Sequence, residues 1–258
     1  KCGGKMKRVP DVIDCWLDSG DMPVAQVHYP FDPESLTMFE DGRYPADYIC
    51  EAVDQTRGWF YSLHALATLL FNQIAFKNVI CLGHILDAQG EKMSKSRGNV
   101  VEPWKIINKY GADALRWYCL TATPPGNVKR FSEDQVADVT RRFQLILWNV
   151  YSFFVMYANI DQYRPEPGLK FTPEVELDRW IISELNQLIQ QVDYDLDNYD
   201  PTDAGRKIEN FINDLSNWYV RRSRRRFWKS ENDRDKLAAY NTLYTCLVTI
   251  ARLLAPFM

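Results

Sequence analysis

A basic loop at residues 90–99 carries the strongest chemical signal in the sequence. It reads Gly-Glu-Lys-Met-Ser-Lys-Ser-Arg-Gly-Asn, which places Lys92, Lys95 and Arg97 within six residues, between Gly90 and Gly98. Glycines let the backbone turn sharply, and small serine side chains let main-chain N–H groups approach an anion. The loop therefore suits phosphate binding, although it lacks the G-x-x-x-x-G-K-[ST] spacing of P-loop proteins. The alternative is a solvated basic hairpin without a ligand.

Three polar side chains, Glu51, Asp54 and Gln55, lie where a β-prone run leads into a helical pattern. At the carboxyl end of a strand, a carboxylate can meet a substrate ammonium group or ribose hydroxyls. The alternative is a helix N-terminus at which Asp54 is the cap and the other two side chains are solvated. Trp59 follows on the helical pattern, where a tryptophan is more often a core residue than part of a binding site.

A second basic segment, residues 218–229, interleaves cations with aromatic rings. Six of its twelve residues are Lys or Arg, and four are aromatic. This combination offers phosphate contacts beside stacking surfaces, as RNA recognition requires. The candidate RNA-binding residues are Arg221, Arg222, Arg224, Arg225 and Trp228. Alternatively, the arginines neutralise the C-terminal dipole of a helix and pair with acidic residues nearby, namely Asp193, Asp195, Asp197 and Asp200.

The elements that must position these residues change character along the chain. A β-prone run at 48–53, a helical pattern at 57–71 and an apolar run at 79–86 predict a strand–helix–strand crossover in a parallel sheet. Beyond residue 126 the apolar residues recur at helical spacing, and Pro201 stands where a helix should begin. The faces expected to be buried comprise Trp59, Leu63, Leu66 and Leu70; Val136, Val139, Phe143, Leu147, Val150 and Phe154; Leu177, Ile181, Leu185, Leu188 and Val192; Ile208, Phe211, Ile212, Leu215, Trp218 and Tyr219; and Leu237, Tyr240, Leu243, Leu247, Ile250 and Leu254. The predicted fold class is an α/β part followed by an all-α helical bundle.

Composition excludes several classes of protein. With 258 residues, 46% of them hydrophobic, the chain can bury a sizeable core, which excludes disorder as its main state. Lys plus Arg is 31 and Asp plus Glu is 34, so the net charge of −3 gives no bulk attraction to nucleic acid or membrane. Six widely spaced cysteines without a C-x-x-C pair are typical of a reduced, intracellular protein.

The best candidate for a membrane span is residues 143–160, which carry no formal charge. Several polar side chains within the stretch would need partners in hydrocarbon, and its tyrosines suit a buried bundle helix better. We therefore expect no membrane contact.

Residues 92–96, Lys-Met-Ser-Lys-Ser, are identical to the signature of class I aminoacyl-tRNA synthetases. A chance match of five fixed residues in a chain of this length is roughly one in 10⁴. Residues 11–20 (Asp-Val-Ile-Asp-Cys-Trp-Leu-Asp-Ser-Gly) and 51–60 (Glu-Ala-Val-Asp-Gln-Thr-Arg-Gly-Trp-Phe) resemble blocks of the isoleucyl-tRNA synthetases in the same order. The resemblance covers essentially the whole chain. The chain resembles the isoleucyl enzymes more closely than the valyl enzymes, in which a Ser commonly replaces Asp18.

The resemblance implies an ATP-dependent ligase that uses ATP and Mg²⁺ to form isoleucyl-adenylate and then transfers isoleucine to its tRNA. It assigns Lys92 and Lys95 to catalysis of adenylation, with Lys95 contacting the ATP phosphates. Replacement of Lys95 by Ala should then lower kcat more than ATP affinity, because charge develops on the leaving pyrophosphate.

The resemblance also implies roles for the residues near the strand end. Glu51 would contact the aminoacyl-adenylate, Asp54 and Gln55 would lie around its ribose, and Trp59 would help to wall the amino-acid pocket. In the same way, the arginine-rich segment falls in the helical anticodon-binding domain, which favours contact with tRNA.

Three segments are expected from the resemblance. Residues 1–125 would be the C-terminal part of the catalytic domain, 126–168 a connecting helix and linker, and 169–258 a truncated anticodon-binding domain. Cys2 resembles the second half of a zinc knuckle whose first cysteines would lie upstream, so a zinc site would belong only to a full-length protein. A monomeric, cytoplasmic enzyme is implied, of which this chain is a fragment that is inactive alone, because it contains no His-Ile-Gly-His type motif.

Three other interpretations remain open at this stage. The chain could be a valyl-tRNA synthetase fragment, which differs from the isoleucyl one at few positions. It could be another nucleotide-binding α/β transferase, which would bind ATP without affinity for tRNA. A stand-alone tRNA-binding helical module is the third.

Overall fold

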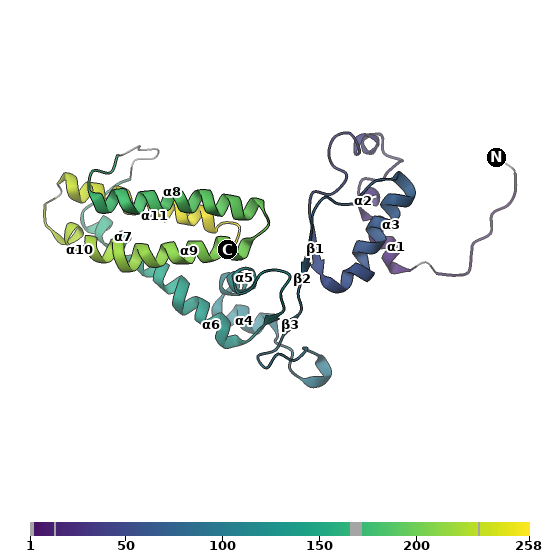
Figure 1. Ribbon diagram of the computed structural model, residues 1–258, viewed down its shortest axis with the longest axis horizontal. Helices are drawn as coiled ribbons and strands as arrows, with labels where there is room; N and C mark the ends of the chain where they lie inside the picture. Colours follow the sequence, from purple (N-terminus) through teal and green to yellow (C-terminus); the bar gives the residue numbers. More distant parts are fainter. Residues whose placement is uncertain (1–2, 13, 166–171, 232) are drawn as a thin grey trace. The chain divides into compact units, whose positions relative to one another are not determined.

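The computed structural model describes residues 3–12, 14–165, 172–231 and 233–258. The chain divides into two compact units, residues 1–84 and residues 85–258 (Figure 1). Each unit has a hydrophobic core of its own.

The first unit contains a two-stranded parallel sheet whose strands are connected through a helix. Its elements are α1 (Cys15–Gly20), α2 (Met22–Ala25), the 3₁₀ helix η1 (Pro33–Thr37), β1 (Ile49–Ala52), the 3₁₀ helix η2 (Val53–Arg57), α3 (Trp59–Phe71) and β2 (Val79–Leu82). In the parallel pair, Ile49 lies opposite Val79 and Ala52 opposite Leu82, which confirms the predicted crossover.

Helix α3 differs from its prediction in where it begins and in which face it buries. It begins at Trp59 rather than at residue 57, because the preceding residues form the 3₁₀ turn η2. The buried face runs through Phe60, Leu63 and Ala67, whereas Leu70 is 60% exposed. The predicted face was therefore wrong at its end, because the buried stripe runs through the residues that share a core cluster with Ile49, Met38 and Tyr44.

The second unit begins with a small α/β part that holds the signature loop, residues 90–99. Its elements are β3 (Ile85–Leu86), the 3₁₀ helix η3 (Lys95–Arg97), α4 (Pro103–Tyr110), α5 (Ala112–Thr121), β4 (Lys129–Arg130) and α6 (Glu133–Val139). Strands β3 and β4 are parallel. The apolar run 79–86, predicted as one strand, is two strands in different sheets, because residues 83 and 84 belong to neither ladder.

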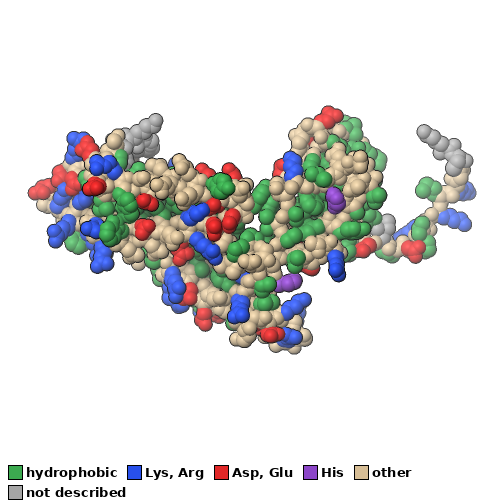
Figure 2. Space-filling view, in the orientation of Figure 1, with side chains coloured by type: hydrophobic (Ala, Val, Ile, Leu, Met, Phe, Trp, Pro, Cys, Tyr) green, Lys and Arg blue, Asp and Glu red, His purple; other side chains and the backbone are tan. Residues whose placement is uncertain are grey.

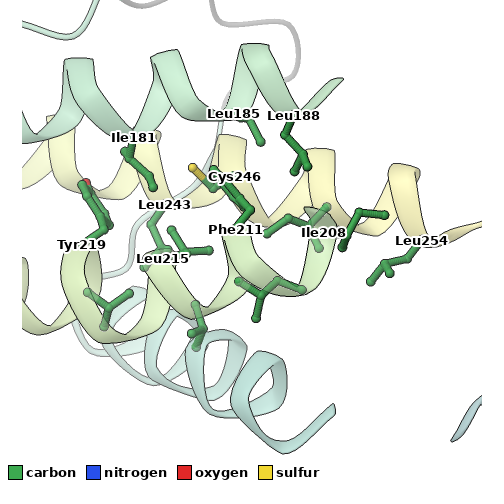
Figure 3. Packing of buried hydrophobic residues seen from close by; sticks show 14 of the residues in the cluster. Ile181, Leu185, Leu188, Ile208, Phe211, Leu215, Tyr219, Leu243, Cys246 and Leu254 are labelled. Carbon is green, nitrogen blue, oxygen red and sulfur yellow. The ribbon is translucent and has the colours of Figure 1, made fainter. Parts of the chain in front are cut away.

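The rest of this unit is a helical bundle, as predicted. It comprises the π-helical turn η4 (Thr140–Gln144), α7 (Leu145–Ile160), α8 (Glu176–Asp197), α9 (Pro201–Asp214), the π-helical turn η5 (Leu215–Val220), α10 (Arg221–Trp228) and α11 (Arg234–Leu254). Pro201 is the first residue of α9, since proline lacks the N–H that a first turn leaves unpaired. Ile181, Leu185 and Leu188 of α8 point toward α9 and α11 in one shared core (Figure 3).

Two residues of the predicted bundle faces are exposed instead. Trp218 is 50% exposed and Leu237 is 51% exposed. Trp218 lies in η5, where a π turn holds an extra residue and so breaks the spacing from which its burial was predicted. Leu237 lies in the first turn of α11, before the helix enters the core at Ala239 and Tyr240.

Two helical stretches are long and apolar enough, by length and composition, to cross a membrane: Glu133–Ile160 and Arg234–Leu254. Both contribute side chains to the bundle core, among them Val150 and Ile250. Core helices of soluble proteins satisfy the same criterion, so the two stretches are weak evidence for a span.

Candidate functional site

The signature loop folds back on β3 and then forms a short 3₁₀ turn. Leu86 forms an antiparallel bridge with Lys92, and the N–H of Asp87 donates to the carbonyl of Glu91 at 2.9 Å. The turn η3 ends at Gly98, whose φ of 66° lies in the left-handed region that favours glycine. Met93 packs against the core formed by side chains of α4, α5 and α6 and by Phe131, so the loop is attached to the fold through its middle.

Two side chains that the sequence did not single out, Asp87 and Asn99, brace the loop. The Asp87 carboxylate accepts the N–H of Glu91 at 2.7 Å and of Gln89 at 3.1 Å, and it accepts the Asn99 amide at 2.8 Å. Asn99 in turn accepts the N–H of Ser94 at 2.9 Å. These bonds, the one from Asn99 first among them, hold the pKa of Asp87 below its usual range. The sequence did contain a signal for this brace: an Asp stands before the loop and an Asn at its end, twelve residues apart.

The two lysines predicted to be catalytic are exposed cations on this braced loop. Among the described residues, neither the Lys92 nor the Lys95 ammonium group forms an ion pair or a hydrogen bond within the chain. Arg97, by contrast, pairs with Glu91 at 3.1 Å. The loop therefore holds two lysines available to an anion, and one arginine that already has a carboxylate partner.

In the first unit, the residues predicted to meet the substrate lie on consecutive turns after β1. The N-cap residue of α3 is Gly58, and the side-chain oxygen of Gln55 accepts the N–H of Trp59, the first residue of the helix, at 3.0 Å. The expectation that Asp54 might be that cap is wrong: Asp54 is exposed and does not cap α3. The half-buried Trp59 indole donates to the carbonyl of Ser19 at 3.0 Å, and Glu51 is exposed at the sheet. The structure thus brings Gln55 and Trp59 together and leaves both carboxylates open to solvent.

The arginine-rich helix α10 presents four exposed arginines: Arg221, Arg222, Arg224 and Arg225. Within the described ranges none of them forms an ion pair. The expected alternative of pairing with acidic residues of α8 and its loop is wrong, since Asp195 pairs with Lys207 at 2.5 Å and Asp200 caps α9. The Arg222 guanidinium lies 4.3 Å from the centre of the Trp218 ring, and Trp228 is 57% exposed. Charged side chains gather at the end of the bundle where α10 lies (Figure 2).

Arg226 differs from its four neighbours, because it is the anchor of α10. It forms two hydrogen bonds with the fully buried Asp178 carboxylate, at 2.6 and 2.7 Å, and an ion pair with Asp235 at 2.8 Å. The Tyr219 hydroxyl donates to Oδ1 of Asp178 at 2.8 Å. Burial disfavours the charged form of Arg226, but the bonds to Asp178 and the neighbouring acidic groups Tyr219 and Asp235 together outweigh it and raise its pKa. The sequence held no local signal that separates Arg226 from Arg225, because the carboxylate that pairs with Arg226 lies on α8.

No group of three or more His, Cys, Asp or Glu side chains placed to hold a metal occurs in the part of the chain that the structure describes. Cys2, the residue with a resemblance to a zinc knuckle, lies outside the described residues. The arrangement offers cations for phosphates and carboxylates for amines or hydroxyls.

Comparison with known families identifies the chain. Residues 1–132, more than half of the 258, match the tRNA synthetases of class I (I, L, M and V). The chain belongs to the class I tRNA synthetase family. Residues 178–258 match the anticodon-binding domain of tRNA ligase. Synthetases of class I use ATP, which agrees with a loop that presents two free lysines.

Curated relatives resemble the chain throughout its length. An isoleucine–tRNA ligase of Dehalococcoides mccartyi is 70% identical over 257 residues, which is 100% of this chain and 25% of that protein. An isoleucine–tRNA ligase of Thermus thermophilus is 55% identical over 99% of this chain and 24% of its own length. The chain thus spans about a quarter of the length of the relatives that it matches.

Solved structures show the same class I synthetase fold. The ternary complex of Agrobacterium radiobacter LeuRS, tRNA and LeuAMS matches with a TM-score of 0.76 and 22% identity, covering 100% of this chain and 31% of that one. The Mycobacterium tuberculosis methionyl-tRNA synthetase in complex with methionyl-adenylate matches with a TM-score of 0.75 and 24% identity, covering 94% and 47%. At these identities the likeness concerns the fold.

Proposed function

We propose that this chain is the signature-loop part of an isoleucine–tRNA ligase, which activates isoleucine with ATP and transfers it to tRNA. The observation that carries the proposal is a pair of unpaired lysines, Lys92 and Lys95, on a braced loop in a synthetase-family chain 70% identical to an isoleucine–tRNA ligase. The activity belongs to the full-length enzyme, and the chain alone is expected to be inactive.

The lysines act on the charge that develops during adenylation. When the isoleucine carboxylate attacks the α-phosphate of ATP, negative charge grows on the bridging oxygen and on the departing pyrophosphate. Ammonium groups that are already held beside these oxygens stabilise the transition state more strongly than they stabilise the bound ATP. Lys95 contacts the phosphates and Lys92 assists it, while Mg²⁺ arrives with ATP as part of the substrate.

We further propose that the residues after β1 contact the aminoacyl-adenylate. Exposed and free of a capping role, Glu51 and Asp54 can accept hydrogen bonds from the isoleucine ammonium group and the ribose hydroxyls. Gln55 is half-buried and fixed to the backbone of α3, so it positions this turn and contacts the ribose from there. Trp59, held by Ser19, walls the amino-acid pocket.

The exposed face of α10 contacts tRNA. Arg221, Arg222, Arg224 and Arg225 supply unpaired charge for phosphates, and Trp228 supplies a ring on which a base can stack. In this proposal residues 1–125, 126–168 and 169–258 keep the roles expected of them: catalytic part, connection and anticodon-binding part. We further propose a cytoplasmic monomer without a membrane partner, in which a zinc site belongs only to the full-length protein.

Segment exchange tests the proposal. The 257 matching residues of the Dehalococcoides mccartyi ligase are replaced by this chain, and amino-acid-dependent exchange of pyrophosphate into ATP is measured with isoleucine, valine, leucine and methionine. We expect exchange with isoleucine, and its loss when Lys95 is also changed to Ala. An inactive but folded chimera contradicts the proposal, and exchange that is faster with valine assigns the chain to the valyl enzymes.

A further inference from the structure

Strand β4 supplies a further cation, Arg130, beside the signature loop. The carbonyl of Leu86 accepts the N–H of Phe131 at 2.8 Å, whereas the N–H of the next residue, Asp87, donates to Glu91. The C=O and N–H of one trans peptide unit point in opposite directions. Hence β4 and the loop flank β3 on its two edges.

The register puts Lys92 and Arg130 at the same level on either side of Leu86. Leu86 is the partner of Arg130 in the parallel pair and of Lys92 in the antiparallel bridge. Residues directly opposite one another in a sheet project from the same face. Neighbouring strands lie about 4.8 Å apart, so the backbones of Lys92 and Arg130 are about 10 Å apart. Both side chains are long enough to reach a polyphosphate that lies between them.

The Arg130 guanidinium lies over the turn that leads into the loop. A Cβ placed on Gly90 would lie 3.4 Å from Nε and Nη2 of Arg130, so the guanidinium lies within van der Waals contact of this turn. Gly90 has a φ of 88°, and its backbone makes the turn through a bond to the carbonyl of Asp87. The loop and the arginine therefore fit together at a position where glycine is required.

Arg130 is available for a ligand, unlike the basic residues next to it. It is exposed, and across the described residues its side chain makes neither an ion pair nor a hydrogen bond. Lys129, the preceding strand residue, projects from the opposite face and donates to the carbonyl of Cys119, and Arg97 pairs with Glu91. A planar guanidinium can hold two oxygens of one phosphate group at once, which an ammonium group does not do.

We propose that Arg130 is a third phosphate-binding residue of this site, holding the polyphosphate of ATP and the departing pyrophosphate together with Lys92 and Lys95. The inference rests on the proposed function, because it takes the loop to be the phosphate site. Arg130 contributes a bidentate contact to the phosphate at the end away from the reacting α-phosphate.

Titration of the 258-residue chain with inorganic pyrophosphate at low salt tests the inference. The variants are Arg130→Ala, Arg130→Lys, Lys95→Ala and the control Arg141→Ala, which also removes one exposed arginine, but one that pairs with Asp138 outside the loop. We expect Arg130→Ala to weaken binding about tenfold, Arg130→Lys to weaken it by roughly threefold, and Arg141→Ala to change it less than twofold. Unchanged thermal unfolding of Arg130→Ala shows that the fold is intact.

The outcomes separate the inference from the proposed function. If Lys95→Ala weakens pyrophosphate binding and Arg130→Ala does not, Arg130 is not part of the site and the loop remains one. If the unchanged chain does not bind pyrophosphate, both the inference and the phosphate role of the loop fail. A parallel titration with tRNA distinguishes the other source of phosphate: loss of tRNA binding alone in Arg130→Ala would assign the arginine to the RNA backbone and overturn the inference.

Discussion

The signature loop and helix α10 are basic segments of the chain that are anchored by different means. In the loop, Asp87 and Asn99 hold main-chain groups and each other over only twelve residues. In α10, Arg226 reaches the buried Asp178, which is 48 residues away in the sequence. Both segments present unpaired cations to solvent, but one is fixed by local hydrogen bonds and the other by a buried ion pair.

This difference matters for what each segment can do. Local hydrogen bonds near the surface are worth little each, so a loop held by them can rearrange when a ligand offers other partners. A buried charge cannot lose its partner without a large cost, so α10 is fixed in place before any RNA arrives. The loop therefore suits a catalytic step in which negative charge develops on the substrate. Helix α10 suits a binding surface that is formed before its ligand arrives.

The largest effect is expected from the anchor of α10. Replacing Arg226 by Ala leaves the fully buried Asp178 carboxylate without its cation, which should lower the free energy of unfolding by about 3–5 kcal/mol. Urea denaturation followed by circular dichroism measures it. Arg225→Ala, which removes an exposed and unpaired arginine from the same helix, should change stability by less than about 0.5 kcal/mol. Equal losses in the two variants would show that Arg226 is no anchor.

The next effect concerns catalysis by the loop. In the chimeric ligase, Lys95→Ala should lower kcat for pyrophosphate exchange about 100-fold or more, because removing a preorganised transition-state contact costs that much. The KM for ATP should change by less than about threefold, since the ground state carries less charge at that place. Steady-state kinetics over a range of ATP concentrations separates the two. Equal losses in kcat and in ATP binding would contradict a transition-state role.

Sequence patterns predicted the local features of the site and missed the non-local ones. The loop, the strand–helix–strand crossover and the buried stripe of Ile181, Leu185 and Leu188 follow from neighbours in the sequence, and the structure has them. Trp218 was misplaced because a π turn changes the helical spacing. Arg226 could not be told from Arg225 by residue type, because its role is decided by a carboxylate on another helix.

The exposed face of α10 should give an effect on tRNA binding of intermediate size. Changing Arg221, Arg222, Arg224 and Arg225 to Ala should weaken binding of tRNA for isoleucine by roughly 10- to 100-fold and reduce the dependence of log K on log salt by roughly 0.7–0.9 per lost phosphate contact. Filter binding across a salt series measures both.

The matched control replaces the same number of positively charged side chains by Ala, at positions that already pair with a carboxylate. These are Arg43, Lys77, Arg97 and Arg141, each of which pairs with a nearby Asp or Glu. If this control weakens tRNA binding as much as the α10 variant, net charge rather than the α10 surface accounts for the affinity.

The smallest effect tests the brace of the loop through its pH dependence. The pKa of Asp87 is lowered in the folded chain, chiefly by the Asn99 amide, so the brace is fully present above the ordinary Asp pKa of about 3.9 and is lost as pH falls through the lower folded value. The amide resonance of Glu91, which donates to Asp87, should therefore titrate below that pH. In Asn99→Ala its midpoint should rise toward about 3.9.

Asp233, the N-cap residue of α11, supplies the internal control for this titration. Asp233 accepts the N–H of Lys236 at 2.8 Å, and its pKa is lowered by Lys229 rather than by anything in the loop. The midpoint of the Lys236 amide should therefore be the same with and without Asn99. If the Glu91 midpoint also stays where it was in Asn99→Ala, the brace does not depend on Asn99, and the loop is held by Asp87 and Met93 alone.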